Sequence, residues 1–92
     1  MSKYFSISEN VMLNEVENQG VIFYEDENLE EKIYYLNDTS LAVILYLETG
    51  KKSADEIANH IYKHFSVDFE ECKKDVEDLL ETMEKYNLIL AV

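Results

Sequence analysis

The stretch Lys32–Ser40, KIYYLNDTS, decides the fold because it changes from one type of secondary structure to another. Its first half, Ile33–Leu36, consists of β-branched, aromatic and apolar residues, which favour strands. Its second half is typical of a helix start, since the capping sequence Asn-Asp-Thr precedes an apolar helical pattern that begins at Leu41. The stretch therefore predicts a strand that runs almost directly into a helix.

The residues before this stretch predict two more strands. Val11–Val16 and Val21–Tyr24 are apolar runs, and the sequence between them has turn chemistry, with Asn18 and Gly20 both able to adopt positive φ. The acidic segment Glu25–Glu31 predicts a solvated loop, because like charges at this density repel one another. Residues 1–10 indicate no element. Together with Lys32–Leu36 these runs predict a three-stranded antiparallel sheet, which needs cover on one face.

Two helices are expected directly after the sheet. The first spans about Thr39–Glu48, and Gly50 is placed to terminate it. The second starts with a capping box, Ser53–Glu56, in which the serine and glutamate side chains can satisfy two backbone amides reciprocally. Its apolar residues recur at helical spacing as far as Phe65.

A third helix is expected to start near Asp68, with Val67 packed as a hydrophobic staple against Cys72. Asn87 can end it in the left-handed conformation, and Leu88–Leu90 is expected to fold back as an apolar tail. Its apolar stripe consists of Cys72, Val76, Leu79, Leu80, Met83 and Tyr86. The expected fold class is thus α+β, winged helix-turn-helix-like, with a three-stranded antiparallel sheet followed by three helices, in a single domain over residues 1–92 with its core at about 11–90.

Charge restricts the classes of partner. Twenty acidic residues against eight basic ones give a formal net charge of −12. Nucleic-acid backbones and anionic membrane surfaces attract basic proteins, so we expect neither as a partner and favour a peptide or protein. A winged-helix transcriptional regulator-like module is the alternative, although the outward face of the third helix is acidic. Without a signal-type apolar run, a cytoplasmic location is expected.

No residue pattern indicates catalysis or a cofactor. Gly20 and Gly50 lie too far apart to form a phosphate-binding loop. His60 and His64 are spaced to offer two ligands to a metal ion, with Cys72 as a conceivable third. The helical pattern instead favours surface histidines and a buried cysteine, and a single cysteine forms no internal disulfide. We therefore expect no enzyme activity, no metal and no cofactor.

The strand Lys32–Leu36 is expected to lie at the edge of the sheet, since a loop precedes it and a helix follows it directly. An edge strand presents unpaired N–H and C=O groups, which form a template for an added strand. An ordinary edge that is protected by Lys32 and by its short length is the alternative, and these residues alone do not decide between the two.

Short motifs extend from Val11 to Leu90: Tyr35–Asn37, the capped helix that follows, Gly50, Ser53–Ile57, Val67–Asp68, Asp75–Val76, Leu79–Leu80 and Asn87–Ile89. Their order and spacing resemble the PqqD-like family, the recognition elements of ribosomally made, post-translationally modified peptides. Two positions depart from the family pattern. Asn87 stands where glycine is usual, and Leu45 stands where many members have tryptophan.

The resemblance implies a non-catalytic adaptor that binds the leader of a precursor peptide as a fourth antiparallel strand, in a groove between the third strand and the third helix. It implies that the backbone of Lys32, Ile33, Tyr34 and Tyr35 pairs with the leader, and Leu36 is counted with them as peptide-binding. Helical-wheel positions favour one flank of the third helix as the other wall, namely Lys73, Val76, Glu77, Leu80 and Glu84. The opposite flank remains open: Asp75, Asp78, Thr82 and Tyr86. The implied enzyme partner is a radical S-adenosylmethionine maturase or a lasso-type protease–cyclase pair, and the sequence does not separate them.

Overall fold

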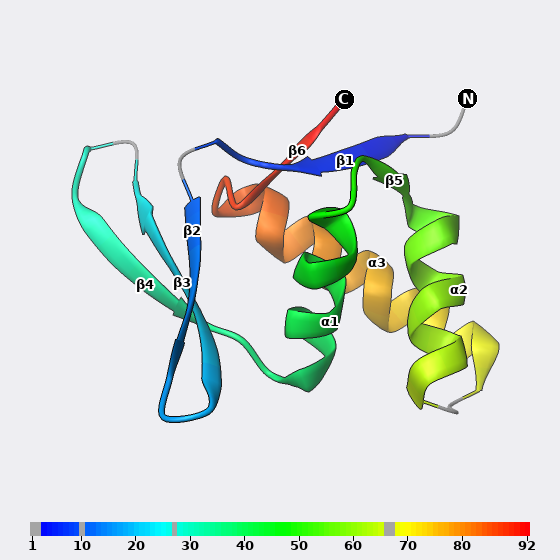
Figure 1. Cartoon of the computed structure of the whole chain (residues 1–92). Coiled ribbons are helices and arrows are strands. Elements are labelled where there is room, and N and C mark those ends of the chain that lie inside the picture. Colours follow the sequence, from blue (N-terminus) through cyan, green and yellow to red (C-terminus); the bar gives the residue numbers. More distant parts are fainter. Residues whose placement is uncertain (1–2, 10, 27, 66–67) are drawn as a thin grey trace.

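A computed structural model of the chain describes residues 3–9, 11–26, 28–65 and 68–92. Figure 1 shows a sheet of three strands to one side of the helices, with a second group of short strands across one end of the molecule. In chain order the elements are β1 (Tyr4–Ile7), β2 (Val11–Val16), β3 (Gln19–Glu25), β4 (Glu31–Tyr35), α1 (Asp38–Leu47), β5 (Lys52–Ser53), α2 (Ala54–Phe65), α3 (Phe69–Lys85) and β6 (Ile89–Ala91). The predicted α+β class, with strands followed by three helices, is confirmed.

Strands β2, β3 and β4 form the predicted antiparallel sheet in the order β2-β3-β4. The turn between β2 and β3 consists of Glu17 and Asn18, whose φ angles are 52° and 68°. Positive φ at both residues is typical of the tight type I′ hairpin turn. The prediction that Gly20 supplies a positive φ is wrong, because it lies within β3 and is buried. A Cβ atom there would lie 2.9 Å from Cδ1 of Leu41, so glycine permits α1 to approach the sheet closely.

The loop between β3 and β4 is exposed, as predicted, but it is also organised by hydrogen bonds. Oδ1 of Asp26 accepts hydrogen bonds from the backbone N–H groups of Asn28 and Glu30, both at 2.9 Å. Leu29 adopts a φ of 62°, and its side chain is 78% exposed. These bonds hold Asp26, Asn28 and Glu30 in a defined turn at the tip of the β3–β4 hairpin.

A second sheet, in the order β5-β1-β6, joins segments from the two ends of the chain. Its middle strand, β1, lies within residues 1–10, where the sequence indicated no element. The Tyr-Phe-Ser-Ile sequence of β1 buries Phe5 and pairs antiparallel with Lys52–Ser53 and with Ile89–Ala91. The predicted apolar tail is therefore partly a strand, and the sheet holds both ends of the chain against the helices.

The helix starts follow the predicted capping chemistry. Oδ1 of Asn37 accepts a hydrogen bond from the N–H of Ser40 at 2.8 Å, and α1 begins one residue earlier than expected. The side chains of Ser53 and Glu56 each accept the other residue's backbone N–H at 3.1 Å, which completes the capping box of α2. At the start of α3, Oδ2 of Asp68 accepts a hydrogen bond from the N–H of Glu71 at 3.2 Å. The expected staple by Val67 lies outside the described residues.

The end of α3 also agrees with the prediction. Asn87 has a φ of 60°, and its N–H donates to the carbonyl oxygen of Glu84 at 3.0 Å. The N–H of Leu88 donates to the carbonyl oxygen of Met83 at 2.9 Å. This pair of bonds is the Schellman motif, in which asparagine replaces the usual glycine. The motif turns the chain back so that Leu88 and Ile89 enter the core.

One hydrophobic core connects the sheets and the three helices. Ile22 of β3 and Ile44 of α1 are at most 1% exposed, and Met83 of α3 is fully buried. Within the described part of the chain, no helix combines the length and the apolar character that a membrane span requires. The core therefore holds one face of sheet β2–β3–β4 against the helices.

Candidate functional site

Strand β4 lies at an edge of its sheet, as predicted. Within the described residues it pairs with β3 alone, and Ile33 lies opposite Phe23 while Tyr35 lies opposite Val21. One long side of β4 is therefore free of backbone partners in the described structure. In Figure 1, β4 forms the outermost strand of the sheet, and β3 and β2 lie between it and the helices in this view.

The hydrogen-bond pattern identifies which backbone groups of β4 are free. The N–H of Leu36 donates to the carbonyl oxygen of Gly20 at 2.9 Å. Hydrogen-bonded and non-hydrogen-bonded pairs alternate along an antiparallel ladder, so the next pair that bonds to β3 contains Tyr34. The N–H and C=O groups of Ile33 and Tyr35 therefore point away from β3, toward the space for an added strand. The expectation that Lys32 and Tyr34 also pair their backbone with the leader is wrong, because their groups face β3.

The side chains of β4 alternate between two environments. Leu36 is 3% exposed in the core, and Tyr34 is partly buried against it. The side chains of Ile33 and Tyr35 are 50% and 66% exposed on the opposite face. The side chain of Leu36, a predicted peptide-binding residue, thus packs in the core, and its amide bonds to β3. Ile33 and Tyr35, in contrast, have backbone groups that are free to bond to an added strand.

The helix wall beside β4 is formed at the C-terminal end of α3. The rings of Tyr34 and Tyr86 lie with their centroids 5.8 Å apart and their planes tilted by 53°. Burial raises the pKa of the Tyr34 hydroxyl, and the neighbouring Tyr86 and Tyr24 hydroxyls raise it further. A hollow of about 270 Å³ adjoins this pair, lined by Tyr24, Asp26, Lys32, Lys85, Tyr86 and Asn87. The aromatic pair therefore connects the inner side of β4 to α3.

The flank of α3 that the helical wheel favoured faces other elements. Lys73 lies 3.9 Å from a carboxylate oxygen of Asp55 on α2, and Glu84 lies 3.3 Å from the ammonium group of Lys3, next to β1. Glu77 and Glu84 line a hollow together with Lys3, Phe5, Ala54, Leu80 and Glu81. The expectation that this flank forms a wall next to β4 is therefore wrong.

The two apolar members of that predicted set are core residues. Val76 is 1% exposed and Leu80 is 2% exposed, so neither side chain has a surface to offer a peptide. A helical wheel shows which residues share a face but does not show which neighbour that face meets. The structure places Tyr86, from the flank left open, in contact with β4.

The same fold and family occur among known proteins. The family model described as coenzyme PQQ synthesis protein D (PqqD) matches residues 9–89. The chain belongs to the PqqD family. A comparison with curated proteins finds no match.

Two solved structures share the fold of this PqqD-family chain. One is described as TbiB1 in complex with the TbiA(beta) leader peptide, with a TM-score of 0.76, 24% identity, and coverage of 91% of this chain and 93% of that one. The other is a lasso peptide synthetase B1 complexed with the leader peptide, with a TM-score of 0.74, 17% identity, and coverage of 94% and 96%. At these identities the likeness establishes the fold.

The histidines of α2 form an aromatic stack. The ring of His60 lies on that of Tyr46 with centroids 4.0 Å apart, and the ring of His64 follows at 4.3 Å. Desolvation lowers the pKa of His60, and the neighbouring His64 and Lys63 lower it further. No group of three histidine, cysteine, aspartate or glutamate side chains within the described ranges is arranged to hold a metal ion.

The side chain of Cys72 lies in the hydrophobic core. It is 2% exposed, and its thiol is within 3.6 Å of the carbonyl oxygen of Ala58. Burial raises the pKa of the thiol, and the nearby Asp75 carboxylate raises it further. A neutral buried thiol is a poor nucleophile, so Cys72 acts as a small core residue.

Proposed function

We propose that this chain is a non-catalytic adaptor, which binds the leader segment of a ribosomally made precursor peptide and presents it to a peptide-modifying enzyme. The free backbone edge of β4 carries the proposal, because the outward groups of Ile33 and Tyr35 can accept a further strand. Membership of the PqqD family and two similar structures, both described as leader-peptide complexes, support it. Neither the family nor the two similar structures favours a winged-helix transcriptional regulator.

In the proposed complex, the leader lies antiparallel to β4. Leader residues opposite Ile33 and Tyr35 exchange backbone hydrogen bonds with them. Leader residues opposite Lys32 and Tyr34 place their side chains on the same face of the sheet as Lys32 and Tyr34. This face points toward Tyr86, the residue that caps the C-terminal end of α3. The hollow next to Tyr34 and Tyr86 therefore binds every second side chain of the leader, whereas β4 binds its backbone.

Backbone pairing alone does not hold the leader. Two bonded pairs supply roughly four hydrogen bonds, each worth about 0.5–1.5 kcal/mol net. Ordering a flexible segment costs about 2–5 kcal/mol, which offsets most of that gain. Micromolar affinity corresponds to about −8 kcal/mol, so buried side chains must supply the remainder. The contacts next to Tyr34 and Tyr86 are therefore essential to the proposal.

The charge of the chain indicates the composition of its partners. A net charge of −12 favours lysines or arginines in the leader or on the enzyme's docking surface. The enzyme class stays open between a radical S-adenosylmethionine maturase and a lasso-type protease–cyclase pair. We expect the adaptor to work in the cytoplasm, where precursor peptides are made and where a lone cysteine such as Cys72 stays reduced.

Amide hydrogen exchange tests the proposal directly, with a synthetic leader taken from a candidate precursor in the neighbouring reading frames as the probe. In the free protein the amides of Ile33 and Tyr35 exchange rapidly, because they point away from β3, whereas the amide of Tyr34 is protected. Saturating leader should protect Ile33 and Tyr35, and a leader of scrambled sequence should not. Absence of leader binding, or new protection on β2 instead of β4, would refute the proposed mode. The precursor's mass should stay unchanged when the adaptor alone is added.

A further inference from the structure

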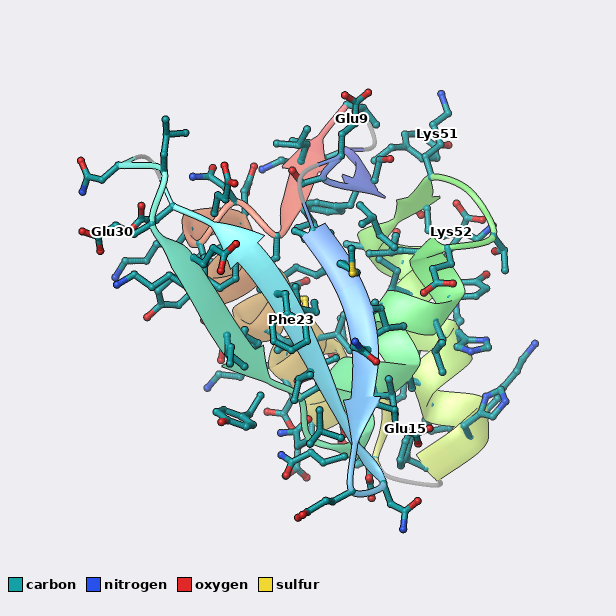
Figure 2. The ribbon with its side chains drawn as sticks, turned by 60° about the vertical axis from the view of Figure 1, so that its left-hand side comes forward. Glu9, Glu15, Phe23, Glu30, Lys51 and Lys52 are labelled. Carbon is teal, nitrogen blue, oxygen red and sulfur yellow. The ribbon has the colours of Figure 1, made fainter. Side chains whose placement is uncertain are left out.

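Apolar and aromatic side chains gather on the face of sheet β2–β3–β4 that points away from the helices, alongside the polar residues Asn14 and Gln19. Met12, Phe23 and Ile33 lie directly opposite one another on the three strands, so their side chains share this face. Tyr35 and Val16 continue the same face along β4 and β2. We call these five residues the outer patch. In Figure 2, Phe23 lies on the middle strand with the helices behind the sheet.

The exposure of the outer patch is large for apolar side chains. Met12 is 64% exposed, Tyr35 66%, and Val16 and Ile33 each 50%. Phe23 is half-buried, and Val21, which lies opposite Tyr35 on the same face, is 2% exposed. The neighbouring positions that face inward, such as Ile22, are buried against the helices. Such a group of exposed apolar side chains on one face of a small domain marks an interaction site, with Val16 at its far end, beyond Asn14 on β2. The outer patch is therefore a second surface, distinct from the inner side of β4 that faces Tyr86.

Acidic residues adjoin the outer patch, whereas the nearest lysine in the sequence, Lys32, lies on the other face of β4 and forms ion pairs with Asp26 and Glu30. Glu25 lies directly opposite Glu31 at the end of the same face. Residues 4–31, which include β2 and β3, contain no lysine or arginine. A second copy of this chain would bring like-charged carboxylates together across the interface, which is unfavourable for a chain of net charge −12. Charge complementarity instead selects a protein whose apolar contact surface is bordered by lysines or arginines.

The outer patch is continuous with the proposed leader site. Ile33 and Tyr35 contribute their side chains to the outer patch and their free backbone groups to the added strand. Leader residues opposite them would place their own side chains beside the patch, because directly opposite residues share a face. A protein on this face would thus contact the adaptor and the bound leader together.

We infer that the outer patch is the docking surface for the peptide-modifying enzyme, which engages it through an apolar contact bordered by lysines or arginines. This inference rests on the proposed function. Docking there places the enzyme across the added strand, so the loaded adaptor presents more contact surface than the empty one. The adaptor therefore brings the leader and the enzyme together on one sheet, which consists of β2, β3, β4 and the added leader strand.

Charge substitutions far from β4 test the docking surface. The probes are a candidate modifying enzyme from the neighbouring reading frames and the synthetic leader, and the variants are Met12→Glu and Val16→Glu on β2. Val92→Glu is the matched control, because Val92 is also 64% exposed but lies outside the sheet. Leader affinity should stay within about twofold of wild type in all three. Enzyme affinity for the loaded adaptor should fall at least about tenfold in the β2 variants only.

The outcomes separate the two proposals. If the leader binds normally and both β2 variants bind the enzyme like wild type, the docking inference fails and the proposed function stands. If the wild-type adaptor binds no leader, the proposed function fails and the inference fails with it. The inference is also overturned if the wild-type loaded adaptor binds no enzyme. Sedimentation of the adaptor alone completes the test, since a dimer that Met12→Glu dissociates would make a second copy the occupant. Thermal melts exclude misfolded variants, and Val16→Glu remains available if Met12→Glu unfolds.

Discussion

Proline at Tyr35 should block the leader while it leaves the fold intact. Proline has no N–H to donate, and its ring occupies the space of the removed hydrogen. The Tyr35 amide points away from β3, so its loss removes no hydrogen bond from the sheet, and edge strands tolerate proline at such positions. The substitution therefore separates the binding edge from the sheet that supports it.

The expected loss follows from the ladder. A bonded pair contributes two hydrogen bonds of about 0.5–1.5 kcal/mol each, so disruption of the pair at Tyr35 costs about 1–3 kcal/mol. Since about 1.4 kcal/mol corresponds to a tenfold change, leader affinity should fall about 5- to 150-fold. The free energy of unfolding should change by less than about 1 kcal/mol, because the side chain is mostly exposed.

Three control variants isolate the amide. Tyr35→Ala removes the same side chain but keeps the N–H, so it should bind the leader nearly as wild type does. Tyr34→Pro removes an amide that bonds to β3, so it should destabilise the fold. Glu15→Pro places proline at an outward amide of β2, the opposite edge of the sheet, and should leave leader binding unchanged.

Fluorescence anisotropy of a labelled leader measures affinity in each variant, and urea unfolding measures stability. Strand addition at β4 is wrong if Tyr35→Pro folds normally and binds the leader with wild-type affinity. A loss of binding in Glu15→Pro, without one in Tyr35→Pro, would assign the leader to β2. An equal loss in Tyr35→Ala would show that the side chain, rather than the backbone, carries the contact.

Three further predictions concern single side chains. Tyr86→Ala should weaken leader binding severalfold, whereas Glu84→Ala, on the flank that faces β1, should not; anisotropy titrations compare them. The buried Cys72 thiol should react with Ellman's reagent only slowly until urea unfolds the protein, and rapid reaction in the native state would contradict its burial. Because the folded state lowers the pKa of His60 below its ordinary 6.5, the unfolded state takes up the proton first as pH falls. Stability should therefore fall from about pH 7.5 to about pH 5.5 by more in wild type than in His60→Gln, as urea unfolding can measure.

Local chemistry made much of the fold predictable. The capping residues Asn37, Ser53 and Asp68 act over one helical turn, and each forms the predicted bond. The left-handed conformation of Asn87 is likewise a local feature, which is predictable from its position directly after the apolar stripe of α3. Such elements depend on residues a few positions apart, which a single sequence displays directly.

The features that the sequence did not predict, strand β1 and the flank of α3 next to β4, depend on contacts between residues far apart in the chain. Strand β1 is stabilised by partners near residue 52 and near residue 90, and its short run is too brief to stand out without them. Its alternation of Phe5 and Ile7 with polar Ser6 and Ser8 is the signal that could have identified it. The flank of α3 that faces β4 depends on how α2 and β1 pack on the other side, so helical periodicity alone left it undetermined.

The sheet has two edges, and their chemistry differs in a way that favours β4 as the leader's edge. On β2 the outward amide of Glu15 is already bonded to the side chain of Asn14, at 2.8 Å, which reduces the groups available to an added strand. On β4 the outward amides of Ile33 and Tyr35 have no such side-chain bond among the described residues. A strand on β4 also meets the aromatic contact between Tyr34 and α3. Because backbone bonds barely exceed the cost of ordering a leader, an edge with both free amides and an aromatic wall should be filled first.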